Sequence, residues 1–184
     1  MTLTETPICN FGEKAKSFDL LSTANKKISL NDIKGENGTL IMFICNHCPY
    51  VKAVVKDIVE DAKYLETLGI KSVAIMSNDV KNYPEDSFEN MVSFSKLHNF
   101  SFPYLIDETQ KIAKEYGAVC TPDFFGYNKN LELQYRGRIR ELKNLKPVGK
   151  GNSDLRIAMQ LIATSGKGPK NQVPSMGCNI KWFK

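Results

Sequence analysis

The feature that most constrains this chain is a pair of cysteines placed between a buried strand and a helix. Residues 39–44 form an unbroken apolar run, which is typical of a strand buried on both faces. A Cys-Asn-His-Cys segment follows at residues 45–48. Apolar residues then recur at helical spacing, which predicts a helix over residues 49–68 that ends before Gly69. The two cysteines are therefore expected at the N-terminus of a helix.

That position favours redox chemistry. The N-terminus of a helix carries unpaired N–H groups and a partial positive charge, and both stabilise a thiolate. We expect this to lower the pKa of Cys45, which would act as the nucleophile. Cys48, three residues later, can reach Cys45 and close a small disulfide, so the pair can exchange two electrons. His47 lies between them, and as an imidazolium it would further favour the thiolate.

The rest of the chain alternates strand and helix patterns. This alternation predicts an α/β sheet with helices on both faces, within a single domain that spans residues 1–184. Short strands are expected at residues 18–21 and 27–30, a strand at 70–76, helices at 84–97, 109–116 and 154–163, and a hairpin from 123–127 to 131–137. Ser153 is a candidate N-cap for the last helix. Long loops are expected at residues 143–153 and 165–175.

A second element that can serve redox chemistry is Thr121-Pro122, which precedes an apolar strand. A proline that opens a strand is unusual and restricts the residue before it. With a cis peptide bond, the backbone of Thr121 would turn toward the cysteine pair and hold an extended substrate segment. We therefore predict that Thr121 and Pro122 bind substrate.

These elements resemble the thioredoxin fold, and the lead-in sequence resembles its redoxin branch, the alkyl hydroperoxide reductase/thiol-specific antioxidant family. The chain resembles more closely a peroxiredoxin-like subgroup with a Cys-Asn-His-Cys segment. The resemblance covers nearly the whole chain and implies a central mixed sheet of about five strands flanked by helices, extra N-terminal strands, a C-terminal tail and a cis bond before Pro122. It rests on the segments that begin at Phe18, Ile28, Leu40, Cys45, Asn78, Tyr83, Phe102, Tyr116, Tyr135 and Pro174.

Departures from the family pattern separate two activities. In peroxiredoxins the peroxidatic cysteine corresponds to Cys48, and Cys48-Pro49 matches. The pattern also requires a proline seven residues earlier and a hydroxyl three residues earlier, where this chain has Ile41 and Cys45. The arginine that activates the peroxide in peroxiredoxins corresponds to a position close to Thr121-Pro122 of this chain. Without these groups to polarise the O–O bond, disulfide exchange is favoured, and a thiol peroxidase that uses Cys48 is the alternative. The buried acid of thioredoxin also has no counterpart in residues 40–44.

The other cysteines leave further alternatives open. Cys120 adjoins Thr121, and Cys178 lies in an apolar island that predicts a tail docked back on the domain, so either could be a third redox cysteine. Cys9 has no motif. Cys45, His47 and Cys48, with Cys120 or Cys178, would also suit zinc or copper(I), so a metal-binding redoxin is a weaker alternative. No second Cys-x-x-Cys or His pair supports it, and we assign no metal site and no cofactor.

Composition and charge bound the partners and the compartment. The chain has 184 residues, 42% hydrophobic and 24% charged, which is typical of a globular protein. It has no apolar run long enough to cross a bilayer and no secretory leader, so we expect a cytoplasmic protein without a membrane partner. Residues 136–184 carry a net charge of +9, but no nucleic-acid motif accompanies it, so no nucleic acid is predicted. The expected partners are a protein or small-molecule thiol or disulfide and an electron donor that the sequence does not name.

Overall fold

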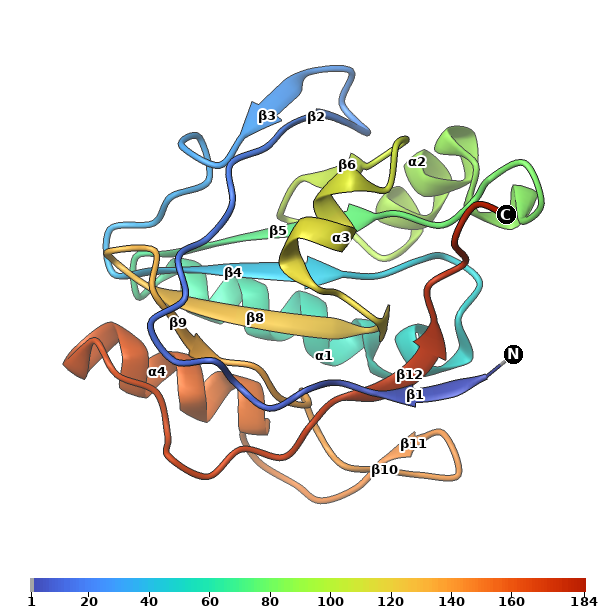
Figure 1. Ribbon diagram of the computed structural model, residues 1–184. Helices are drawn as coiled ribbons and strands as arrows, with labels where there is room; N and C mark the ends of the chain where they lie inside the picture. The colour runs from blue at the N-terminus through green and yellow to red at the C-terminus, as the bar shows by residue number, and fades with distance from the viewer. Residues whose placement is uncertain (1) are drawn as a thin grey trace.

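A mixed seven-stranded sheet organises the computed structural model, which describes residues 2–184 (Figure 1). β4 lies near the centre, parallel to β5 on one side and antiparallel to β8 on the other. The remaining strands extend the sheet, so that β3 and β9 form its two edges. In spatial order the strands are β3 (Lys27–Ser29), β2 (Asp19–Ser22), β6 (Tyr104–Ile106), β5 (Ile70–Met76), β4 (Gly38–Phe43), β8 (Asp123–Asn128) and β9 (Leu133–Tyr135).

Helices cover both faces of this sheet. α1 (Pro49–Glu66), α2 (Phe88–Leu97) and α4 (Asp154–Ser165) pack on one face, and α3 (Lys111–Tyr116) packs on the other. Side chains of β4 alternate between the two cores, because successive residues of a strand point to opposite faces. This explains the unbroken apolar run, and the structure confirms the predicted thioredoxin-like α/β fold.

A small second sheet joins the two ends of the chain. In it, β12 (Met176–Asn179) lies between β1 (Leu3–Glu5) and β7 (Cys120–Thr121), antiparallel to both. The predicted docking of the C-terminal tail is confirmed, and the tail runs along the molecule as the red strand of Figure 1. The expected loop at 143–153 contains most of a short hairpin, β10 (Leu142–Lys143) and β11 (Lys146–Pro147).

The helix expected over residues 84–97 is divided in two. A 3-10 turn, η1 (Pro84–Asp86), comes first, and α2 begins only after Ser87. Ser87 has an extended backbone, and its hydroxyl accepts a hydrogen bond from the Asn90 amide, so it caps α2. The break changes the direction of the chain and leaves the side chain of Asp86 fully buried.

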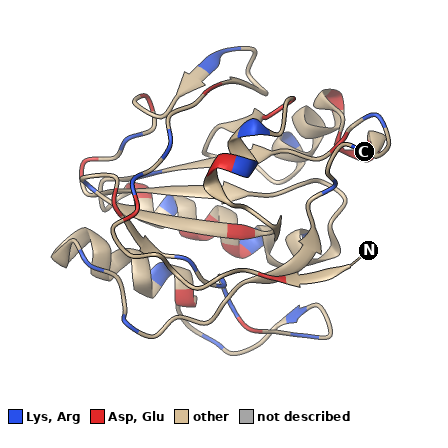
Figure 2. Ribbon diagram, in the orientation of Figure 1, with Lys and Arg blue, Asp and Glu red and all other residues tan. Residues whose placement is uncertain are grey.

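Charges of both signs are distributed over the ribbon (Figure 2). In the basic C-terminal quarter, each arginine is paired with a carboxylate. The pairs are Arg136–Asp123, Arg138–Asp154, Arg140–Asp57 and Arg156–Asp61. Among the described residues, no helix combines the length and the apolar character that crossing a membrane would require.

Candidate active site

The two cysteines lie where β4 ends and α1 begins. Cys48 is the N-cap residue of α1, with φ −64° and ψ 122°, and Pro49 occupies the first turn. Proline suits this position because its missing N–H would have no partner in the helix. Both side chains are inaccessible to solvent, with exposed fractions of 1% for Cys45 and 0% for Cys48. The sequence therefore predicts the place of the pair correctly.

Thr121 contacts both sulfurs. Its hydroxyl lies 3.4 Å from Cys45 Sγ, and its carbonyl accepts a hydrogen bond from the Cys48 thiol at 3.1 Å. The Thr121–Pro122 peptide bond is cis, as the family resemblance implies. The substrate-binding role predicted for these residues stays a prediction, and the backbone of Thr121 is already paired with β12.

The acidities of the two thiols differ from the expectation that Cys45 holds the thiolate. Its hydrogen bond to Cys48, burial and the charge of Asp86 raise the pKa of Cys45. The Cys45 thiol lowers the pKa of Cys48 to about 5, and the backbone N–H groups of Val51 and Cys178 also favour its thiolate. Burial and the Thr121 carbonyl oppose this shift. The main reason is the interaction between the two thiols, which favours charge on Cys48 over charge on Cys45, and the Val51 amide in the first turn of α1 adds to it.

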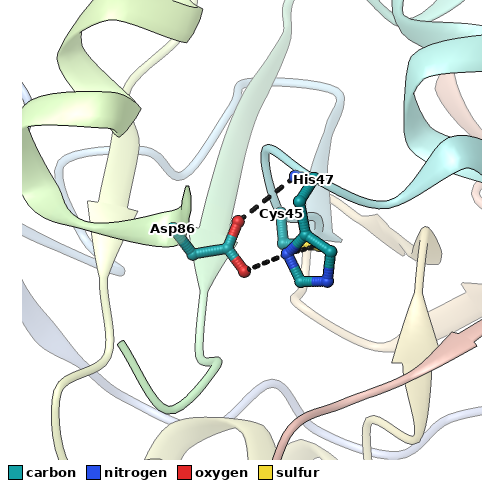
Figure 3. A group of neighbouring side chains, drawn as sticks. All are labelled: Cys45, His47 and Asp86. Carbon is teal, nitrogen blue, oxygen red and sulfur yellow. Dashed lines mark hydrogen bonds and ion pairs between the residues drawn. The ribbon is translucent and has the colours of Figure 1, made fainter. Parts of the chain in front are cut away.

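A buried carboxylate, which the sequence did not reveal, completes the site. Asp86 Oδ2 lies 2.7 Å from His47 Nδ1, and Asp86 Oδ1 accepts the backbone N–H groups of Asn46 and His47 at 2.8 and 3.3 Å. His47 Nδ1 is also 3.9 Å from Cys45 Sγ (Figure 3). Tyr104 donates to the side-chain carbonyl of Asn46 at 2.9 Å, which fixes the loop further. The loop between the cysteines is therefore held from η1 and β6.

His47 and Asp86 favour each other's charged form. The hydrogen bond that His47 donates to Asp86 raises the pKa of His47, although burial opposes this. Burial would raise the pKa of Asp86, but its bonds to His47 and Asn78 outweigh burial and lower it. The site therefore combines a thiolate-forming cysteine, a second thiol and an imidazolium–carboxylate pair. In the sequence, the one indication of Asp86 is its place in the segment that begins at Tyr83, which is among those that carry the family resemblance.

Cys45, His47 and Asp86 also qualify as donors for a metal ion, since their ligand atoms lie within 4.8 Å of one another. This set differs from the predicted one, which had Cys48 and a further cysteine in place of a carboxylate. Both oxygens of Asp86 already accept two hydrogen bonds each, the fourth coming from Asn78 at 2.8 Å. A metal would have to displace several of these bonds, so the donor set fits an ion pair better than a metal site.

The remaining cysteines separate into three environments. Cys178, on β12, is in hydrogen-bond contact with Cys48 through both its thiol and its backbone N–H. Cys120 is fully buried, and its thiol donates to the carbonyl of Pro122 at 3.7 Å. Cys9 is half-buried, and desolvation raises its pKa to about 11. The structure thus brings Cys178, rather than Cys120 or Cys9, into contact with the pair.

Solved structures with the same fold include two that cover almost the entire chain. An uncharacterized conserved protein from Geobacillus kaustophilus is 39% identical, with 100% of this chain and 97% of that chain covered and a TM-score of 0.94. A hypothetical protein from Sinorhizobium meliloti is 35% identical, with 98% of each chain covered and a TM-score of 0.91. A thiol:disulfide interchange protein from Chlorobium tepidum, at 16% identity, 84% and 96% coverage and a TM-score of 0.61, shows a similar fold only.

Family membership follows from the sequence. No functionally curated protein matches the chain. The model of the AhpC/TSA family, however, matches residues 11–142, which include the cysteine pair and Thr121-Pro122. This chain therefore belongs to the AhpC/TSA family, a redoxin family of thiol-based oxidoreductases within the thioredoxin-like superfamily.

Proposed function

We propose that this protein is a thiol–disulfide oxidoreductase that cycles Cys45 and Cys48 between a dithiol and a disulfide. The observation that carries this proposal is the placement of both sulfurs at the start of α1, where the hydroxyl of Thr121 contacts Cys45 and its carbonyl contacts Cys48. Two thiols in contact can form a disulfide without large movements of the backbone. The lowered pKa of Cys48 supplies the thiolate that exchange requires.

The contacts support an order of steps in which Cys48 attacks first. Its thiolate attacks one sulfur of a substrate disulfide, which forms a mixed disulfide and releases a substrate thiolate. The His47 imidazolium gives its Nδ1 proton to that thiolate, and Nδ1 then accepts the proton of Cys45, whose sulfur lies 3.9 Å away. The Cys45 thiolate then attacks Cys48 Sγ. The Cys45–Cys48 bond forms and the second substrate thiolate leaves.

Burial of the two sulfurs limits which partners can react with them. With exposed fractions of 1% and 0%, neither sulfur meets a large substrate without a local opening of the site. The proposed partners are a protein or small-molecule thiol or disulfide that reaches the pair during such openings.

Insulin reduction with dithiothreitol tests the proposal, with the wild type compared to Cys45→Ser and Cys48→Ser. We expect Cys48→Ser to fall to the uncatalysed rate, because it lacks the attacking sulfur, and Cys45→Ser to turn over well below the wild-type rate, because it lacks the sulfur that resolves the mixed disulfide. Cys9→Ser is the matched control, and it should retain the wild-type rate because Cys9 lies outside the site. Wild-type turnover by either active-site variant would overturn the assignment.

A peroxidase that uses Cys48 is the second candidate, and the lowered pKa of Cys48 favours it. In peroxiredoxins an arginine guanidinium also polarises the peroxide. All four arginines of the chain are paired with carboxylates elsewhere in the fold. Thiol–disulfide exchange therefore fits the site better.

Stopped-flow measurement of hydrogen peroxide consumption separates the two candidates. If exchange is the activity, the reduced protein consumes peroxide no faster than a free thiolate at the same pH. A rate far above that of the free thiolate, abolished in Cys48→Ser and retained in Cys45→Ser, would instead establish the peroxidase.

A further inference from the structure

The C-terminal strand occupies the sheet edge beside the redox pair. β12 pairs with β7 in antiparallel register, with Cys178 opposite Thr121 and Asn179 opposite Cys120. Thr121 is also the residue that contacts both sulfurs of the pair. The chain thus fills, with its own tail, the edge at which we predicted an extended substrate segment.

The approach of the tail is very close at this point. A Cβ atom on Gly177 would lie 2.0 Å from the carbonyl oxygen of Thr121, so only glycine permits this packing. After the strand, the Lys181 backbone N–H donates to Asn78 at 2.8 Å, and the Asn78 side chain donates to Asp86 at 2.8 Å. The tail is therefore connected to both the sulfur side and the carboxylate side of the site.

This packing places a third sulfur beside the pair. Cys178 is 4% exposed and belongs to the same buried cluster as Cys45 and Cys48. Its thiol is in hydrogen-bond contact with Cys48, which therefore interacts with two other thiols. Cys120, the neighbouring cysteine of β7, donates instead to the Pro122 carbonyl.

We propose that Cys178 is a third redox residue of this site, which exchanges with the Cys45–Cys48 disulfide to form a Cys48–Cys178 disulfide. The proposal rests on the function proposed above. The Cys178 thiolate attacks Cys48 Sγ, the Cys48–Cys178 bond forms, and the Cys45–Cys48 bond breaks. Cys45 leaves as a thiolate and takes the proton that Cys178 has lost. The protein neither gains nor loses electrons, and the tail becomes covalently tied to the start of α1.

Oxidation of the pair favours this exchange. In the reduced protein, burial and the nearby Cys48 raise the pKa of Cys178 to about 12, which keeps it a thiol. Once Cys48 is part of a disulfide its charge is gone, so its contribution to the raised pKa disappears. Cys178 becomes a better nucleophile only when there is a disulfide to attack.

Peptide mapping under non-reducing conditions tests the proposal in the full-length chain. Cleavage after lysine leaves Cys45 and Cys48 together in peptide 35–52, Cys178 in 171–181 and Cys120 in 115–129. A Cys45–Cys48 disulfide stays within one peptide, whereas a Cys48–Cys178 disulfide joins two. After oxidation by diamide and alkylation, we expect Cys45→Ser to yield peptide 35–52 joined to 171–181.

Three comparisons decide the outcome. Cys45→Ala repeats the test without a buried hydroxyl. Partly oxidised wild type should contain the joined peptides as a minor species, and this species should be absent from Cys178→Ser. The role of Cys178 would be overturned if Cys45→Ser and Cys45→Ala lacked the joined peptides. It would also be overturned if peptide 35–52 were joined to 115–129 instead. In either case, an intrapeptide disulfide in the wild type would still uphold the proposed function. A wild type that forms no intrapeptide disulfide would overturn the proposed function, and this inference with it.

Discussion

His47 Nδ1 and Asp86 Oδ2 lie 2.7 Å apart, and the carboxylate is fully buried. The two residues come from different elements, the loop before α1 and the 3-10 turn η1. A buried ion pair is costly to desolvate unless further hydrogen bonds satisfy it. Here Asn78 and the backbone N–H groups of Asn46 and His47 supply those bonds. The pair therefore sets the charge beside Cys45 and also fixes the loop that holds the cysteines.

Replacing Asp86 with asparagine should lower the pKa of His47 to its ordinary value of 6.5 or below, because burial would then act without an opposing carboxylate. The pKa of Cys45 should fall as well, since the charge of Asp86 raises it. NMR titration of the His47 ring measures the first effect. Glu85→Gln is the matched control, because Glu85 is exposed and should leave the titration unchanged.

The same Asp86→Asn variant should lose about 1–3 kcal/mol of stability, since a neutral amide at this position would pair poorly with His47. The raised pKa of His47 gives stability that is complete below pH 6.5 and lost as the pH rises through its folded pKa. The lowered pKa of Asp86 gives stability that is present above pH 3.8 and lost as the pH falls through its folded pKa. Urea denaturation should show the largest difference between wild type and Asp86→Asn from pH 3.8 to 6.5. A difference that does not depend on pH would contradict the ion pair.

Cys48 should be the thiolate of the reduced protein. Ultraviolet absorbance of the thiolate should show a transition centred at about pH 5, well below the ordinary cysteine value of 9.0. The transition should be absent in Cys48→Ser. It should shift upward in Cys45→Ala, because the Cys45 thiol is the main group that lowers this pKa. A transition that is retained in Cys48→Ser and lost in Cys45→Ser would assign the thiolate to Cys45.

The sheet and its helices could be predicted because local pattern and burial agree. The run at residues 39–44 has to be buried on both faces, and the stripe of α1 and the glycine at 69 define the helix that follows. The division at Ser87 was missed because residues 84–97 are compatible with one continuous helix, and only the capping bond to Asn90 shows where it breaks. β6 and β12 are not among the predicted strands, because both are short and their pairing depends on partners distant in sequence.

The sequence predicts the part of the site that residues close in sequence form. It does not predict the part that the fold brings together from distant positions. Cys45 and Cys48 are separated by two residues, so their contact is local. Asp86 is 40 positions from Asn46 in a bond that the sequence does not suggest. Residues distant in sequence also contribute to the difference between the two thiol pKa values, because Asp86 raises the pKa of Cys45 and the tail amide of Cys178 favours the Cys48 thiolate.

The predicted N-cap of α4 can be tested through stability. Ser153 accepts a hydrogen bond from the Arg156 amide at 2.9 Å and donates to the buried carboxylate of Asp61. Ser153→Ala should cost about 1–2 kcal/mol, because it removes the cap and leaves Asp61 without one of its donors. Ser165→Ala, at the exposed end of the same helix, should change stability by less than about 0.5 kcal/mol. Equal effects of the two variants in urea denaturation would refute a capping role.

The close approach at Gly177 should control access to the sulfurs. In Gly177→Ala the added Cβ would lie 2.0 Å from the Thr121 carbonyl, so β12 has to move away from β7. Overpacking of this kind costs about 1–3 kcal/mol, which would make local opening roughly 5- to 150-fold more frequent. Alkylation of Cys48 should accelerate accordingly, and hydrogen exchange should increase in residues 176–179. Met176→Ala is the control, since Met176 is an exposed residue of the same strand. Unchanged alkylation of Cys48 in Gly177→Ala, together with faster exchange in β12, would show that the tail does not limit access to the pair.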